Sequence, residues 1–135
     1  MSGKIEARLQ ELGIEIPEAA APVANYVAYV VTGKLGENMD AEAGAAAARA
    51  CAISLLAQVK AACGGDLDRV VRCVRLGGFV NSTADFTDQP EVINGASNLM
   101  VEVFGDAGKH ARSAVSAASL PVGVAVEVEC VAELA

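Results

Sequence analysis

The sequence predicts an α+β domain in which two main helices pack on one face of a small mixed β-sheet. Three observations carry this prediction. Apolar residues recur with helical spacing over 41–63 and 90–104. Residues 70–80 are apolar on both faces of an extended chain, and residues 124–131 alternate with the period of a strand. With 135 residues and no internal repeat, the chain is expected to form one domain over residues 1–135.

Composition narrows the class of protein. Hydrophobic residues make up 53% of the chain and aromatic residues only 4%, so the core is rich in Ala and Val, and some apolar surface is expected between subunits. The net charge of -7 makes nucleic acid an improbable main partner, because binding phosphates requires basic patches. The amino terminus has no apolar signal core, and no apolar run reaches the ~20 residues of a membrane span. We therefore expect a cytoplasmic protein that does not bind a membrane.

The cysteines are expected to be structural. None of the four has CxxC spacing and all lie in apolar runs, which predicts small buried side chains in a reducing cytosol. A zinc site would need ligand pairs that are absent, so no metal is expected. The four are Cys51, Cys63, Cys73 and Cys130.

The helices have clear ends. Residues 2–12 carry an apolar helical face, with Ser2 as the cap and Gly13 as the stop. Asp40 is a good N-cap for the helix over 41–63, which Gly64 and Gly65 end. Asp88 and Pro90 are typical of the start of the helix over 90–104.

The strands are expected at 25–32, 70–80, 112–119 and 124–131. Helices should cover at least one face of the second strand. The arginines at its start (Arg69, Arg72 and Arg75) are expected to be solvated or paired at a sheet edge or subunit contact.

The last two strands are predicted to form a hairpin through the turn at 120–123. With a tight turn, Glu127 and Glu129 share the face of Arg112. Glu127 would still lie roughly 14 Å along the strand from the level of Arg112, too far for one small ligand. Either the connection is not tight, or a second subunit completes the site.

These charged residues are the candidates for chemistry. The guanidinium of Arg112 offers a planar fork for a small carboxylic acid, or it forms an ion pair with a glutamate such as Glu127 or Glu129. One of these glutamates could position or deprotonate a water, or both lie on an exposed sheet face. His110, the only histidine, is interpreted as a loop residue.

Tyr26 and Tyr29 are the only tyrosines. Three residues apart on a strand, they lie on opposite faces. One is expected in the core, and the other could line a pocket.

At these positions the chain resembles the RidA family, also called the YjgF family. The specific part is carboxy-terminal: Ala111-Arg-Ser-Ala-Val115, Leu120-Pro121 and Val126-Glu-Val-Glu129. Further matches are Asn25-Tyr26, Val92-Ile-Asn94, Gly33-Lys-Leu-Gly36 and Gly78-Phe-Val-Asn-Ser82. They resemble a bacterial branch often labelled translation initiation inhibitor or endoribonuclease.

The resemblance implies a chorismate-mutase-like fold assembled as a homotrimer with clefts between subunits. It also implies a deaminase that hydrolyses 2-aminoacrylate-type enamines and imines to a 2-keto acid and ammonia, without a cofactor. By position, Arg112 would hold the substrate carboxylate and Glu127 would position the attacking water, while Tyr26 and Asn94 would line the cleft.

The chain departs from the family at two places. Family members carry two more strands just after the first one, whereas Thr32-Gly33 here runs straight into Lys34. Two strands with their turns would take about 15–20 residues. Either the protein lacks them, with a site that has lost one wall, or a segment after Gly33 is absent from the printed sequence. Ala114 also stands where the family often has Cys, which excludes thiol chemistry at that point.

Three functions are thus open: a trimeric imine deaminase, a non-catalytic carboxylate-binding or regulatory protein using the same clefts, and RNA cleavage. Retention of both Arg112 and Glu127 favours the enzyme, because a protein that only binds an anionic ligand has no use for a carboxylate that would repel it. The net charge and the lack of a histidine pair disfavour RNA cleavage.

Overall fold

The computed structural model describes residues 3–19 and 31–135 as three α-helices, three strands and three short 3-10 turns. In chain order the helices and strands are α1 (Lys4–Leu12), α2 (Ala41–Ala62), β1 (Val70–Asn81), α3 (Gln89–Phe104), β2 (Ala111–Ala117) and β3 (Val126–Leu134). The turns are η1 (Leu67–Arg69), η2 (Gly105–Gly108) and η3 (Pro121–Gly123).

The predicted helix ends are largely correct. Gly13 ends α1 in the left-handed conformation (φ 66°), where a residue without a Cβ is least strained. The Asp40 side chain accepts a hydrogen bond from the Ala43 N–H and caps α2. Two details differ: Gly3 occupies the N-cap of α1, and Asp88 makes no side-chain cap bond to α3.

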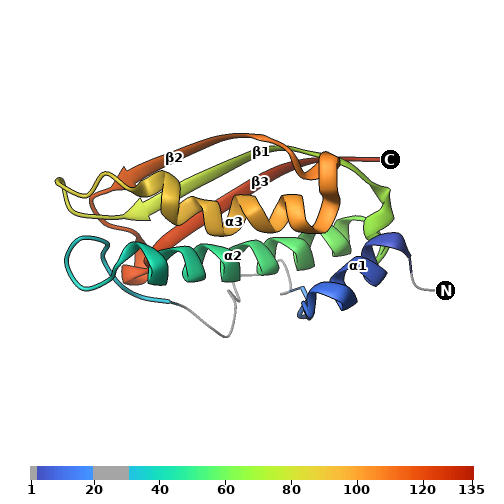
Figure 1. Cartoon of the computed structure of the whole chain (residues 1–135), viewed down its shortest axis with the longest axis horizontal. Helices are drawn as coiled ribbons and strands as arrows, with labels where there is room; N and C mark the ends of the chain where they lie inside the picture. Colours follow the sequence, from blue (N-terminus) through green and yellow to red (C-terminus); the bar gives the residue numbers. More distant parts are fainter. Residues whose placement is uncertain (1–2, 20–30) are drawn as a thin grey trace.

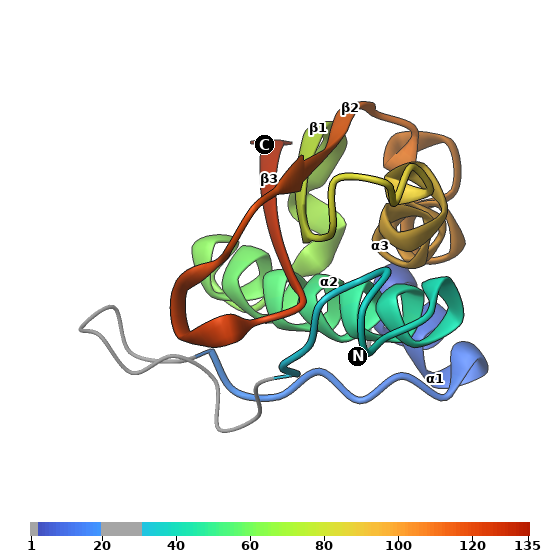
Figure 2. The same cartoon turned by 90° about the vertical axis from the view of Figure 1, so that its left-hand side faces the viewer.

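The sheet is mixed, with strand order β2-β1-β3. The central strand β1 pairs parallel with β2 and antiparallel with β3. Helices α2 and α3 lie side by side along one face of this sheet, and no described element covers the other face (Figures 1 and 2). The α+β class and the two helices on one face of a mixed sheet are therefore confirmed.

The predicted hairpin is wrong. β1 lies between β2 and β3, so the last two strands are not neighbours. A parallel β1–β2 pair needs a long crossover, and α3 with its flanking loops provides it. The predicted strand over 25–32 falls largely outside the described residues; within them, Thr32 forms an isolated antiparallel bridge with Val124.

The core lies between the helices and the sheet. Leu76 and Val80 of β1 are fully buried beneath Val92, Ile93 and other residues of the helices. The cysteines are all free; Cys63 and Cys73 are buried as expected, and Cys51 and Cys130 are half-buried.

The other face of the sheet carries both apolar and charged side chains. Exposed large apolar side chains on this face include Phe79, Val115 and Val131. Among the charged groups, Arg72 pairs with Glu133 at 2.7 Å and Arg75 with Glu129 at 3.4 Å. Arg72 and Arg75 are thus paired, which is one of the expected alternatives, but β1 is the central strand of the described sheet and not its edge. We call this surface the open face.

Helix α2 has the length and hydropathy of a membrane span, contrary to the expectation that no apolar stretch reaches that length. Six of its residues are nevertheless buried in the domain: Gly44, Ala47, Ala48, Ala52, Leu56 and Ala57. A helix that packs its small side chains on a sheet and a second helix meets the same length and hydropathy criteria, so its composition fits a core helix.

Helix α1 is attached to the domain through a carboxylate far along the chain. Asp68, in the turn before β1, accepts hydrogen bonds from the backbone N–H groups of Lys4 (2.8 Å) and Ile5 (2.7 Å). These are orphan donors of the first helical turn. The N–H groups of Ile5 and Lys4 hold the pKa of the Asp68 carboxyl below its usual range.

We predict that Asp68→Ala destabilises the domain at pH 7 and has little effect at low pH. A lowered folded-state pKa means that the stabilisation is fully present above about pH 4, where the unfolded chain ionises, and is lost as the pH falls through the folded-state pKa. Urea unfolding of both proteins at pH 7 and pH 3 checks this. Glu15→Ala, which removes an exposed carboxylate without a hydrogen bond to the described residues, is the control; an equal loss at both pH values would contradict the prediction.

Candidate functional site

Arg112 lies near the start of β2 with its side chain on the helix-covered face of the sheet. Its backbone is opposite Leu76, which is fully buried. Its Nη1 donates to Asn94 Oδ1 at 2.7 Å and to Ser97 Oγ at 3.0 Å, both on α3. The guanidinium is thus half-buried and bound to neutral oxygens, so the expected ion pair with Glu127 or Glu129 is absent within the described chain. Asn94 was expected in the same cleft, and the structure places it in contact with Arg112.

Two further residues belong to this cluster. The Ser97 hydroxyl also lies 2.9 Å from His110 Nε2, and His110 Nδ1 lies 2.6 Å from the Gly108 carbonyl oxygen. His110 precedes β2 as a loop residue, as predicted, but its ring points back to α3. We call Asn94, Ser97, His110 and Arg112 the arginine cluster. Sequence reasoning missed Ser97, although a serine at this position interrupts the buried stripe of α3.

Glu127 does not join the arginine cluster. It is opposite Phe79 in the β1–β3 pair and is exposed on the open face, whereas Arg112 is on the other face. The expectation that the two share a face is wrong because it depended on the hairpin. The pairings place them three residues apart along the sheet and two strands apart across it, about 10 Å in each direction. No small ligand can touch both within one chain.

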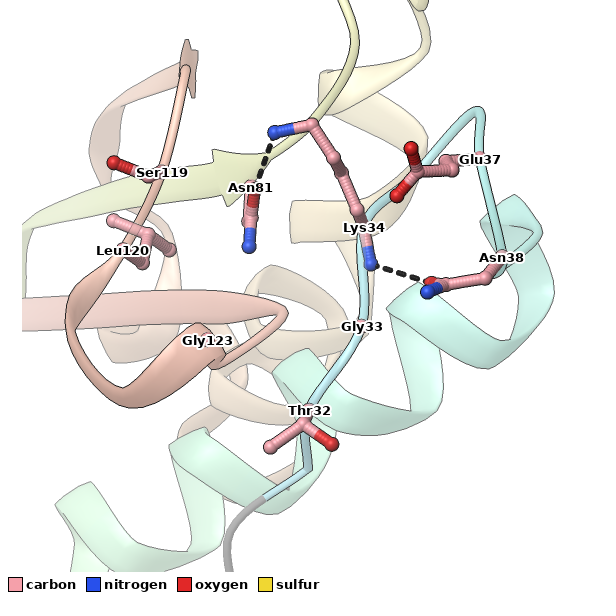
Figure 3. Close-up of a pocket in the computed structure, with 9 residues that line it drawn as sticks. All are labelled: Thr32, Gly33, Lys34, Glu37, Asn38, Asn81, Ser119, Leu120 and Gly123. Atoms are coloured by element: carbon pink, nitrogen blue, oxygen red, sulfur yellow. Dashed lines mark hydrogen bonds between the residues drawn. The ribbon is translucent and has the colours of Figure 1, made fainter.

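One open cavity among the described residues lies away from the arginine cluster. Its volume is about 450 Å³. Asn81 at the end of β1, residues of the segment that follows β2 and the loop at 32–38 line it. Figure 3 shows Lys34 bridging this loop to Asn81. The Lys34 ammonium also donates to the Ala118 carbonyl, so it already binds two oxygens of the chain. Ser119, on its wall, is seven residues beyond Arg112, roughly 20 Å along an extended strand.

Thiols and metals offer no alternative chemistry near the arginine cluster. Burial, and then the negative charge of Glu127, raise the pKa of the Cys51 thiol, so it stays protonated. Cys73 and Cys130 contact each other at 3.8 Å, and the hydrogen bond between them raises the pKa of Cys73 and lowers that of Cys130. Among residues 3–19 and 31–135 no three metal-ligating side chains converge. Tyr26 lies outside the described residues, and its place in the site stays a prediction.

Close packing of helix backbones holds Asn94 and Ser97 in place. Gly95, between them on α3, faces the backbone of α2, and a Cβ there would lie 2.0 Å from the Ala45 carbonyl oxygen. Only a glycine allows this approach. Because Asn94 and Ser97 share the turn with Gly95, the separation of the two helices sets where their oxygens meet Arg112.

We predict that Gly95→Ala lowers the free energy of unfolding by about 1–3 kcal/mol, since the added methyl must push α3 away from α2. Asn98→Ala, at an exposed position of the same helix, should be nearly neutral. Urea unfolding of the two variants provides the comparison. A more stable Gly95→Ala protein would mean that helix propensity outweighs the close contact.

The fold and the arginine cluster define a class: an α+β domain that presents a fixed guanidinium between a helix and an edge strand. Residues 30–134 match the family described as "YjgF/chorismate_mutase-like, putative endoribonuclease". The chain is also 48% identical to the protein TCP17 of Trypanosoma cruzi, with 98% of this chain and 96% of that protein covered. The chain therefore belongs to the YjgF family, and the resemblance noted in the sequence is confirmed.

Two solved structures are also similar. Atu1372 of Agrobacterium tumefaciens, a protein of unknown function, is 41% identical with a TM-score of 0.85, and the match covers 97% of this chain and 93% of that one. A Shewanella oneidensis protein described as "a putative endoribonuclease" is 32% identical with a TM-score of 0.87. The match covers 98% of this chain and 100% of that one.

The alignment with TCP17 is 154 positions long, so at least 19 of them have no residue in this 135-residue chain. The alignment length does not place these positions. The expected loss of two strands after Gly33 stays a prediction.

Proposed function

We propose that this protein is an enamine/imine deaminase that hydrolyses 2-aminoacrylate-type compounds to a 2-keto acid and ammonia. The observation that supports it best is the fixing of the Arg112 guanidinium by Asn94 and Ser97. These bonds use neutral oxygens and leave the positive charge uncompensated within the described chain. A half-buried cation of this kind favours a small carboxylate as its ligand.

The proposed reaction needs orientation more than activation. The enamine tautomerises to an imine, whose C=N carbon is electrophilic. A water oxygen adds to that carbon, and Glu127 accepts the proton that the water loses. The former imine nitrogen takes this proton and becomes an amine. In the collapse that follows, the C–N bond breaks as the C=O bond forms, and the remaining hydroxyl proton passes through Glu127 to the nitrogen. The nitrogen leaves as ammonia and the 2-keto acid remains. Holding substrate and water together accounts for the rate, without a metal or cofactor.

Within one chain this mechanism fails, because Glu127 is on the open face and Arg112 on the other. We therefore propose that copies assemble as a homotrimer through their open faces. The exposed apolar side chains of this face, Phe79 and Val115 among them, are of the kind that subunits bury. β2 is an edge strand of the described sheet, so a neighbouring copy packed there brings its own Glu127 toward Arg112. Each site then takes Arg112 from one subunit and Glu127 from the next.

Two other functions are weighed against this proposal. If the chain stays monomeric, Arg112 remains without a catalytic carboxylate, and a non-catalytic carboxylate-binding protein is the better description. RNA cleavage is suggested by the family description and by the Shewanella protein's name. The net charge of -7 and the engagement of the single histidine in the arginine cluster count against it.

The first experiment generates 2-aminoacrylate in situ and follows its hydrolysis by suppression of semicarbazone formation. We predict activity in the wild type and a loss of about 100-fold or more in kcat/KM for Arg112→Ala, since a bidentate charge-assisted pair contributes about 3 kcal/mol. Arg112→Lys should recover little, because an ammonium lacks the planar fork. An inactive wild type that still binds pyruvate would favour the binding protein.

Subunit mixing tests the shared site. Arg112→Ala and Glu127→Gln chains with different tags are each expected to be inactive. Co-expressed, they should form mixed trimers with about a third of wild-type activity, because only one of the three sites takes its arginine from a Glu127→Gln chain and its glutamate from an Arg112→Ala chain. Glu129→Gln, which breaks the pair with Arg75, is the control partner. Mixed trimers without activity would place both residues of a site in the same subunit.

A further inference from the structure

The hydrogen bonds of the arginine cluster can run in only one direction when the imidazole is neutral. The Gly108 carbonyl only accepts, so His110 Nδ1 carries the proton. His110 Nε2 then has a lone pair and accepts from the Ser97 hydroxyl at 2.9 Å. With its proton given to the ring, Ser97 Oγ is left to accept from Arg112 Nη1 at 3.0 Å. The Gly108 carbonyl thus fixes the His110 tautomer, and the ring in turn orients the Ser97 hydroxyl so that its oxygen accepts from Arg112.

This arrangement uses both hydrogens of Arg112 Nη1. One goes to Ser97 Oγ and the other to Asn94 Oδ1 at 2.7 Å. A guanidinium has five N–H donors, so three are left, on Nε and Nη2. Within the described residues they bind nothing. The Nε–H and one Nη2–H point the same way, and this edge matches the two oxygens of a carboxylate.

The packing of the chain also fixes two members of this series of hydrogen bonds, the Ser97 hydroxyl and the Gly108 carbonyl. Ser97 is only 9% exposed, so water does not compete for its hydroxyl. The Gly108 carbonyl is placed by close packing on α3, because a Cβ at Gly108 would lie 2.1 Å from the Met100 carbonyl oxygen. Ser97 is part of α3 and the Gly108 carbonyl is held against it, so both groups are positioned by the helix that carries Asn94.

We infer that Ser97 and His110 are positioning residues for Arg112, and that they make it bind a small carboxylate side-on, through Nε and Nη2. The inference rests on the proposed function for its substrate, 2-aminoacrylate, but not for its ligand class. His110 acts only through Ser97, and neither residue touches the ligand. Loss of the Ser97 hydroxyl frees one Nη1–H and lets the guanidinium rotate away from the binding orientation.

The test measures carboxylate binding and catalysis separately. Pyruvate, the 2-keto acid product, is titrated into each variant by calorimetry, and KM and kcat are measured with 2-aminoacrylate. For Ser97→Ala we expect Kd and KM to rise about tenfold, the effect of one hydrogen bond to a charged group, with kcat within about twofold. His110→Leu should behave in the same way. His110→Gln should stay near wild type, because its side-chain oxygen can still accept from Ser97.

A double variant separates positioning from general destabilisation. Ser97→Ala with His110→Leu should bind pyruvate no more weakly than Ser97→Ala alone, because His110 has no route to Arg112 without the hydroxyl. Additive losses, or a change in kcat alone, would overturn the inference. A wild type that binds pyruvate without deaminase activity would sink the proposed function and leave this inference standing. A wild type that does not bind pyruvate would overturn the ligand assignment.

Discussion

The closeness of α3 to its neighbours is the constraint on which the rest of the structure depends. On one side Gly95 brings α3 against the backbone of α2, and on another Gly78 of β1 lies under Ile93, where a Cβ would approach its side chain to 2.5 Å. Gly108 brings the following turn against the Met100 carbonyl. Three glycines thus lie at the contacts of α3, which packs closer to its neighbours than alanines at these positions would allow. This close packing brings the side-chain oxygens of Asn94 and Ser97 to Arg112 on the edge strand β2.

This packing has an electrostatic consequence. The Arg112 side chain is drawn under the sheet, between β2 and α3, where a charge loses part of its hydration. Asn94 and Ser97 replace that water with fixed oxygens but supply no negative charge. Two carboxylates of β3, by contrast, are paired on the open face with Arg72 and Arg75. The fold therefore keeps the acids and Arg112 on opposite faces of one sheet.

The elements of the fold could be predicted from the sequence, and their pairing could not. Periodicity locates α2, α3 and β1, and the end signals Gly13 of α1 and Asp40 of α2 act locally. Strand alternation at 124–131 shows which residues share a face of that strand but does not identify the neighbouring strand. Inserting β1 between β2 and β3 reverses the relation of Arg112 to Glu127. For the site, Arg112 and Asn94 were accessible through family resemblance, whereas the role of His110 depends on a contact with α3 that no local pattern encodes.

The open face shows why the position of Glu127 is informative. Of the glutamates on β3, Glu129 and Glu133 each have an arginine partner on the same face, and within the described residues Glu127 has none. It stands beside the exposed side chain of Phe79. A lone carboxylate there would oppose the burial of this face unless the partner surface supplied a donor or a ligand with water. The same requirement applies to Arg112, whose remaining donors need an anion. The proposed contact between copies, with Glu127 of each near Arg112 of the next, would meet both requirements.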